Sequence, residues 1–321
     1  MSSQSFIQLG GPFLNVTLAN HFSLFKKQYN KQYSSKNEEL KRFAIFANTF
    51  QAIEDVNNQD KPYKLAVYEF ADLTEQEFAQ KYLRKPEKIT FSGSVDQNIK
   101  YNLKDNEVDW QALGLIARVK DQGTCGSCWA FGAIGAAEMI YNKQSNRKFK
   151  DFIELSEQDL VDCCHAENTN GCNGGEPIDA MTCLTSGVAS EKDYPYLAYD
   201  SQCADIKKEF ASKGYVQIEK GNNEELLIVL LNQAIDIGVN AAAFNFRFFK
   251  SGVITDGCTW TSIDHDVLLA GSGNVGGIDY WKIKNSWGKN WGQDGYLYVL
   301  REHGKKPALC GLNMKAFYPT V

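Results

Sequence analysis

The residues best suited to take part in a chemical reaction lie in the run Gln122-Gly123-Thr124-Cys125-Gly126-Ser127-Cys128-Trp129-Ala130-Phe131. The residues after Cys128 predict that a helix begins there. A helix N-terminus presents unpaired backbone N–H groups and a partial positive charge, which favour a thiolate over a thiol. Because the thiolate is the nucleophile in covalent catalysis, Cys128 is a candidate catalytic residue, and the Gln122 amide is a nearby hydrogen-bond donor.

The pair Cys125 and Cys128 also fits two other kinds of site. A C-x-x-C spacing occurs in redox proteins and as half of a zinc site. A second C-x-x-C or a His-x-His would favour zinc, and an early βαβ pattern would favour thioredoxin-like chemistry. The chain has none of these features. On this segment alone, a nucleophile remains one option among three.

His265 and Asn285 have the order and spacing of a proton carrier and its orienting partner. His265 lies 137 residues after Cys128, and Asn285 follows 20 residues later. An imidazolium beside a thiol can lower the thiol pKa to roughly 3–4, and it can deliver a proton to a leaving amine. Trp287 would shield the hydrogen bond between His265 and Asn285 from water. The other histidines, His21, His165 and His303, are interpreted as structural residues.

With these segments in place, the chain resembles the papain family, closest in style to cathepsin L-like endopeptidases. The resemblance covers nearly all 321 residues. It implies an α+β fold of two halves behind a helical prosegment, and an inactive precursor of an endopeptidase that works through a thioester acyl-enzyme in an acidic compartment. Cys128 would be the nucleophile, His265 the base and acid, and Asn285 the residue that orients the imidazole. Gln122 and the backbone N–H of Cys128 would form the oxyanion hole.

The resemblance also implies a set of substrate-binding residues. These are Gly126, Gly174, Gly175, Pro177, Ile263, Asp264, Trp287, Trp291 and Lys315. The pocket for the second substrate residue upstream of the cut would have walls of Pro177, Ile263 and Asp266, with Lys315 at its base. Related endopeptidases carry a small or apolar residue at that base and prefer Leu or Phe. Lys315 could instead attract an acidic side chain, unless it pairs with Asp266 or extends outward along its aliphatic stem.

Nine cysteines leave eight once the nucleophile is set aside, which is enough for four disulfides and indicates an oxidising compartment. The resemblance implies three pairs, Cys125–Cys172, Cys163–Cys203 and Cys258–Cys310. Cys164 and Cys183 remain, either as a fourth pair or as two buried thiols.

Residues 1–103 are predicted to form the prosegment, with a helical inhibitor domain at 20–83 and an extended linker at 84–103. Residues 20–57 have a helical apolar stripe, formed by Phe22, Phe25, Tyr29, Leu40, Phe43, Phe46, Phe50 and Ile53. Glu38, Arg42, Ile45, Phe46, Ile53 and Asn57 resemble the signature of cathepsin L-type prosegments, with Thr49 in place of asparagine. Phe70-Ala71-Asp72 resembles the end of a second prosegment motif, in which Ala66 and Tyr68 depart from the usual glycine and asparagine.

The catalytic domain is predicted at residues 104–321, with a mature chain starting near Lys104. Its helical half would span about 113–214 and its β-rich half about 215–321. Short β-like runs at 216–218, 267–270, 280–283 and 296–300 favour strands in the second half. Cys128 and His265 would then come from different halves, with the active site at their interface.

Composition limits the other function classes. The net charge of −5 argues against nucleic-acid binding, and no apolar run is long enough to span a membrane. Residues 1–103 carry a net charge of +2 and residues 104–321 carry −7, so acid should weaken the contact between the two parts. No metal or cofactor is expected, and the protein is predicted to be a monomer that acts on peptides and proteins. We expect a lysosomal, vacuolar or secreted protein, although the N-terminus does not have the pattern of a signal peptide.

Two alternatives to a protease precursor remain. A papain-fold binding protein without catalysis is disfavoured because all four catalytic residue types are present. The N-terminal helical part could also act as a free-standing protease inhibitor. The chain lacks a histidine-rich insertion near Cys172–Cys203 that would close the cleft, which favours an endopeptidase over a dipeptidyl exopeptidase.

Overall fold

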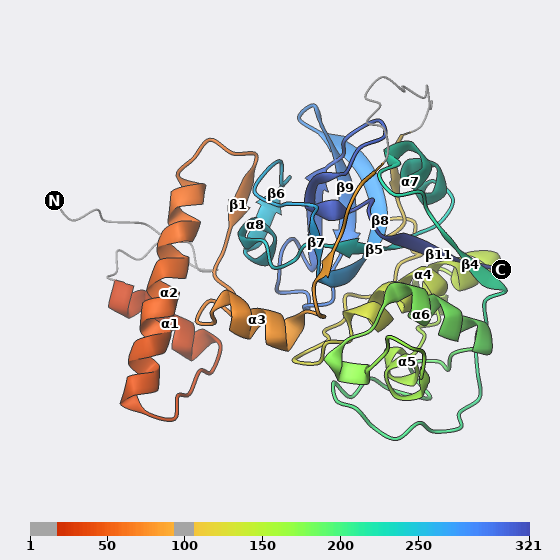
Figure 1. The fold of residues 1–321 in the computed structure, drawn as a ribbon, viewed down its shortest axis with the longest axis horizontal. Helices are drawn as coiled ribbons and strands as arrows, with labels where there is room; N and C mark the ends of the chain where they lie inside the picture. Colours follow the sequence, from red (N-terminus) through yellow and green to blue (C-terminus); the bar gives the residue numbers. More distant parts are fainter. Residues whose placement is uncertain (1–17, 93–105) are drawn as a thin grey trace.

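The computed structural model describes residues 18–92 and 106–321, which we call the N-terminal segment and the main body (Figure 1). The predicted chain start near Lys104 lies outside the described residues. The N-terminal segment contains α1 (Leu18–Gln28), α2 (Lys36–Asn57), β1 (Tyr63–Leu65), α3 (Glu75–Tyr82) and β2 (Glu87–Lys88). In Figure 1, α1 and α2 lie at one end of the molecule, and the segment then crosses the main body.

The helix predicted over 20–57 is broken into α1 and α2. Ser35 caps α2, since its side chain accepts a hydrogen bond from the Glu38 backbone N–H at 3.1 Å. A serine at this position favours a helix start over a helix interior, so the break is encoded locally. Leu40, which was assigned to the apolar stripe, is 55% exposed.

The two helices share an aromatic core. Its buried members are Phe22, Phe25, Phe46, Phe50 and Ile53. Arg42 on α2 binds Glu38 at 2.6 Å and Glu77 on α3 at 2.6 Å, so it ties the helical pair to the segment that continues across the main body. Asp72, from the second prosegment motif, accepts hydrogen bonds from Lys31 and Tyr33.

The first half of the main body is mainly helical, and the second half contains most of the strands and two short α-helices. The helices of the main body are α4 (Cys128–Gln144), α5 (Glu157–Cys163), α6 (Pro177–Cys183), α7 (Asn223–Leu230) and α8 (Phe244–Arg247). Its strands are β3 (Val108–Asp109), β4 (Gly214–Gln217), β5 (Ile235–Val239), β6 (Phe249–Gly252), β7 (Ser262–Ile263), β8 (His265–Val275), β9 (Ile278–Lys284), β10 (Tyr296–Leu300) and β11 (Ala316–Thr320). Short 3-10 helices lie at Phe149–Asp151, Gly171–Asn173, Leu184–Ser186 and Leu309–Gly311.

The main sheet has the antiparallel order β10-β9-β8-β5-β11-β4, with β3 beside β8. Helix α4 packs against β8, β5 and β11, while α5 contacts α4, and α6 contacts both α4 and the strands β11 and β4 (Figure 1). The four predicted β-runs lie in or next to β4, β8, β9 and β10. The α+β fold is therefore confirmed, and α4 reaches the start of β8 where helices and sheet meet. Within the described residues, no helix is both long and apolar enough to cross a bilayer.

The N-terminal segment binds the main body through two strands and one helix. Strand β1 pairs with β6, and β2 pairs with β7, both antiparallel. Between these strands, the Phe78 ring of α3 meets Trp287 edge to face with ring centroids 5.5 Å apart. Strand pairing fixes the register of the segment, and aromatic burial contributes much of its attraction to the main body.

The three disulfides implied by the resemblance are present, and Cys164 and Cys183, whose pairing was left open, form a fourth. Among the described residues, Cys128 is left as the free cysteine. Since three bridges lie among the helices before residue 204, they constrain the part of the chain that holds Cys128.

We expect Phe46→Ala to destabilise the α1–α2 pair by about 3–5 kcal/mol, because the ring is 1% exposed and leaves a cavity among aromatic neighbours. Hydrogen exchange of the full chain, followed by mass spectrometry, measures the local free energy of opening. The control is Leu40→Ala on the exposed face of α2, which should change it by less than about 0.5 kcal/mol. Equal effects of the two substitutions would contradict the assigned core.

Candidate active site

Cys128 is the first residue of α4 and its side chain is fully buried. The backbone N–H groups of Trp129 and Asp266 lie near its sulfur, and their effect is to lower the thiol pKa. The first of these groups belongs to the helix N-terminus and the second to β8, directly after His265. The helix start and the histidine strand therefore meet at this sulfur, as the sequence predicted.

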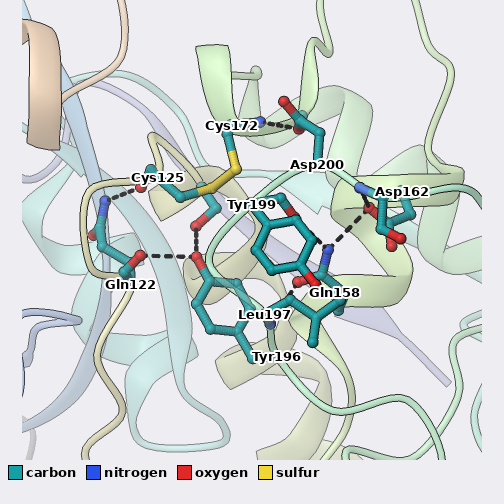
Figure 2. The surroundings of a disulfide bond; sticks show 12 residues. Gln122, Cys125, Gln158, Asp162, Cys172, Tyr196, Leu197, Tyr199 and Asp200 are labelled. Atoms are coloured by element: carbon teal, nitrogen blue, oxygen red, sulfur yellow. Dashed lines mark hydrogen bonds between the residues drawn. A yellow bond between two sulfur atoms is a disulfide. The ribbon is translucent and has the colours of Figure 1, made fainter.

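The loop before α4 is held in place by hydrogen bonds and a disulfide (Figure 2). The Tyr196 hydroxyl lies 2.6 Å from Ser127 Oγ and donates to the Gln122 carbonyl oxygen at 2.9 Å. The Cys125–Cys172 disulfide joins the loop to the chain before α6. These bonds fix the position of the Gln122 side chain relative to Cys128.

His265 begins β8, and its Nε2 lies 2.8 Å from Asn285 Oδ1. An amide oxygen only accepts hydrogen bonds, so Nε2 carries the proton and Nδ1 is left with its lone pair. Nδ1 has no hydrogen-bond partner among the described residues. The Trp287 ring covers the imidazole at a centroid distance of 4.9 Å and screens this hydrogen bond from water.

Burial opposes charge on both reactive groups. It raises the pKa of the Cys128 thiol, and the nearby Asp266 carboxylate raises it further, while Arg84 opposes both effects. Burial also lowers the pKa of His265 to about 4, against the effect of its hydrogen bond to Asn285. In this form of the protein, a neutral thiol and a neutral imidazole are therefore favoured over the ion pair near neutral pH.

Gln122 binds a peptide carbonyl of the N-terminal segment. Its Nε2 donates to the Tyr82 carbonyl oxygen at 3.1 Å and to the Cys125 carbonyl oxygen at 2.9 Å. Its Oε1 accepts from Ser286 Oγ at 2.6 Å, which orients the amide. The side chain predicted to bind a carbonyl oxygen thus holds one in this structure.

Arg84 lies two residues after Tyr82, and its side chain contacts charged side chains of the main body. Its Nε donates to Asp266 Oδ2 at 2.8 Å, and its Nη1 donates to Glu176 Oε1 at 2.9 Å. Its backbone N–H donates to the Asp264 carbonyl oxygen at 2.9 Å. The Arg84 side chain is 2% exposed and that of Asp266 is 0% exposed, so this ion pair is shielded from solvent.

Lys315 binds Glu176 of the main body and Glu87 of the N-terminal segment. The pairing of Lys315 with Asp266, considered from sequence, is not the one observed, because Arg84 holds that carboxylate. A lysine whose ammonium is already paired with Glu176 is a weak attractant for an acidic ligand. The Glu176 contact weakens the case for the acidic preference considered above, although Glu87 shows that an acidic side chain reaches Lys315, so that preference stays a prediction.

The remaining predicted residues differ in what they contact. The Gly174 Cα faces the Cβ of Arg84, and Ile263 packs against Ile89 and Met314. The Asp264 carboxylate is occupied by the Ala241 and Ala242 backbone N–H groups.

Four other predicted residues support the site from beneath or from the side. Gly126 and Gly175 allow close packing on Cys172 and Trp129, and Pro177 is the buried first residue of α6. Trp291 lies beside Trp287 and donates from its indole nitrogen to the Arg247 carbonyl oxygen, so it supports Trp287.

The sequence interpretation missed four residues of this region: Arg84, Glu176, Asp236 and Ser286. Glu176 directly precedes Pro177, which was predicted to line the substrate pocket, so its position in the sequence could have identified it. Asp236 interrupts the apolar strand β5, and neither of its carboxyl oxygens has a hydrogen-bond partner among the described residues. Arg84 had no sequence signal, because its role depends on how the N-terminal segment crosses the main body.

Comparison with known families gives two matches within the chain. Residues 104–320 match the papain family of cysteine proteases, and residues 22–78 match the cathepsin propeptide inhibitor domain. Vignain from Ricinus communis is 38% identical over 299 residues, a match that covers 89% of this chain and 81% of vignain.

Two solved precursor structures have the same overall arrangement. The proform of the Amb a 11 cysteine protease, a ragweed pollen allergen, has a TM-score of 0.81 at 31% identity, covering 95% of this chain and 94% of that one. Digestive procathepsin L2 from Tenebrio molitor has a TM-score of 0.81 at 30% identity, covering 95% of this chain and all of that one.

We expect iodoacetamide to alkylate Cys128 of the intact chain at neutral pH at least about tenfold more slowly than in the urea-unfolded, disulfide-intact chain. The rate follows the thiolate fraction, and burial raises the pKa of this thiol above its ordinary value. Mass spectrometry of labelled peptides measures both rates. Rapid stoichiometric labelling of the folded chain would contradict the neutral, shielded thiol.

Proposed function

The chain belongs to the papain family of cysteine proteases and carries a cathepsin propeptide inhibitor domain, and from this premise we propose that it is the precursor of an endopeptidase. The observation that carries this proposal is the Tyr82 carbonyl oxygen bound by Gln122, next to the buried Cys128. A peptide group already lies where a scissile peptide would have to bind. The contact also supports the N-terminal segment as the group that excludes substrate.

In the proposed reaction, the Cys128 thiolate attacks the carbonyl carbon of the substrate. The oxygen takes up the negative charge and is stabilised by Gln122 Nε2 and the Cys128 backbone N–H. His265 as imidazolium protonates the leaving amine while the C–N bond breaks, which leaves a thioester. Water then attacks the thioester while His265 takes a proton from it, and the C–S bond breaks to give the carboxylic acid and the Cys128 thiolate beside the imidazolium. Asn285 positions the imidazole throughout.

Domain boundaries follow from this proposal. Residues 1–103 act as the prosegment, and residues 104–321 form the protease domain. The prosegment inhibits by covering Gln122, by burying Cys128 and His265, and by inserting Arg84 between two carboxylates. Removal of the prosegment returns water to the cleft, which relieves the desolvation that disfavours the charged thiolate–imidazolium pair.

Substrates, assembly and location are proposed more broadly. We infer general peptide and protein substrates and a monomeric enzyme. Four disulfides support an oxidising compartment, such as a vacuole, a lysosome or the extracellular space. Acidity in that compartment would help to release the prosegment.

Acid incubation of the full chain tests the proposed function directly. We expect N-terminal sequencing to locate a new chain start near residue 104, together with peptide hydrolysis that a thiol-reactive epoxide abolishes. The Cys128→Ser chain should show neither hydrolysis nor labelling. A wild-type chain that releases its N-terminal segment but neither hydrolyses peptides nor reacts with the epoxide would instead be a binding protein of the same fold.

For the activated enzyme, we predict that Gln122→Ala lowers kcat by about 10²–10³ with a smaller change in KM, because the lost donor acts mainly on the developing oxyanion. Steady-state kinetics, normalised to epoxide-titrated sites, measure the effect. Gln111→Ala removes an exposed glutamine away from the cleft and should leave kcat unchanged. An unchanged kcat in Gln122→Ala would remove this residue from the oxyanion hole.

Acid activation should depend on Arg84. Burial raises the pKa of Asp266 and Arg84 lowers it, so the carboxylate binds a proton more tightly once Arg84 has left. Release of the N-terminal segment therefore takes up protons and is favoured as pH falls. The same carboxylate also interacts with Asp236, Lys315 and Glu176, all within the main body.

We therefore predict that Arg84→Met moves the pH midpoint of activation upward and makes the pH dependence shallower, whereas Arg84→Lys has an intermediate effect. The measurement is the onset of peptide hydrolysis after transfer of each precursor to a series of buffers. Superimposable profiles for the wild type and Arg84→Met would show that this ion pair does not control release.

A further inference from the structure

The pocket that holds Arg84 is built from carboxylates on two separate elements. Asp266 lies on β8, and Glu176 lies in the turn before α6. Each accepts one hydrogen bond from the guanidinium, at 2.8 and 2.9 Å. The fork of an arginine matches this arrangement because its nitrogens point toward both acceptors at once.

Contacts around Gly238 place the other pocket residues at the same spot. A Cβ atom added to Gly238 would lie 2.7 Å from Ile263, 3.1 Å from the Cβ of Lys315 and 3.5 Å from Asp266 Oδ1. Asp266, Ile263 and Lys315 therefore converge on one small space, which is the pocket assigned above to the second substrate residue upstream of the cut.

Departure of the N-terminal segment changes the charges of this pocket. Arg84 and Glu87 leave together, and Lys315 keeps Glu176 as its partner. Asp266 then loses its cation. In the precursor its side chain is fully buried and its Oδ1 has no hydrogen-bond partner among the described residues, so a substrate side chain that fills the pocket would bury this carboxylate again. Asp236 lies within electrostatic reach of Asp266 and adds a further carboxyl group.

A buried carboxylate without a partner is costly, and it is stabilised by a proton or by a cation. An apolar substrate side chain would cover Asp266 and leave the carboxylate unpaired. An acidic side chain would meet Asp266 and Glu176, while Lys315 is already engaged by Glu176. A basic side chain is the one type that reproduces the contacts of Arg84.

We infer that the activated enzyme selects peptides with a basic residue, arginine above lysine, at the second position upstream of the cleaved bond, and that Asp266 and Glu176 are the residues that determine this specificity. The inference rests on the proposed function, since it concerns which substrate side chains that same cleft binds. It also explains the role of Arg84, which occupies the pocket as a substrate side chain would.

The test uses enzyme activated from the full precursor, with active sites counted by epoxide titration. Four fluorogenic peptides are compared at one fixed pH, identical except for Arg, Lys, Leu or Glu at the second position upstream of the cut. We expect kcat/KM for Arg to exceed that for Leu by about tenfold or more, since hydrogen bonds to charged groups are worth about that factor. Arg should exceed Glu by about a hundredfold or more, because like charges are rejected.

Two isosteric variants separate charge from shape. Asp266→Asn and Glu176→Gln should each lower the Arg-to-Leu ratio by about tenfold while the Leu peptide is still cleaved. Glu176 is partly exposed in a turn, so Glu176→Gln gives a result even if the core variant folds poorly. Glu167→Gln removes an exposed carboxylate outside the pocket and should leave the ratio at its wild-type value.

The outcomes separate the inference from the proposed function. A titratable enzyme that cleaves the Leu peptide at least as well as the Arg peptide overturns the inference and leaves the protease function intact. An Arg preference that survives in both pocket variants also overturns the assignment to Asp266 and Glu176. An activated wild type that neither titrates with epoxide nor cleaves any of the four peptides contradicts the proposed function itself.

Discussion

The meeting of α4 with β8 is the constraint on which the rest of this structure depends. The sulfur at the start of α4 and the imidazole at the start of β8 come together only if the helical and β-rich parts of the main body pack in one relative position. Asn285 fixes which imidazole nitrogen carries the proton, and Trp287 keeps water from that hydrogen bond. Cys128 and His265 are buried where they meet, and burial disfavours their charged forms. Catalysis therefore requires that the N-terminal segment, which covers them, be removed.

The N-terminal segment uses the groups of the cleft as its own binding partners. Its aromatic residues cover Trp287, a backbone carbonyl binds Gln122, and Arg84 fills the carboxylate pocket. Each contact has a counterpart in the proposed recognition of substrate. Inhibition and specificity therefore rest on the same side chains, and a substitution in the pocket should change both.

Much of this arrangement could be predicted from sequence because its signals are local or closely spaced. The start of α4 at Cys128, the β-runs of the second half and three of the disulfides were predicted correctly, while the Cys164–Cys183 pair was one of two alternatives left open. The break between α1 and α2 was missed because apolar periodicity was weighted above the cap at Ser35. The partners of Lys315 and the role of Arg84 could not be predicted, since they depend on contacts between residues 139 and 182 positions apart in the chain.

The central claim is that the covering N-terminal segment holds Cys128 and His265 as a neutral pair. Far-ultraviolet absorbance of the thiolate, taken as the difference between the wild type and Cys128→Ser, measures it in the precursor and in the activated enzyme, where the inactive variant is cleaved by added wild-type enzyme. The account predicts a thiolate signal between about pH 5 and 7 in the activated enzyme, as an imidazolium-paired thiol should give, and none in the precursor. Identical titration curves for the two forms would contradict it.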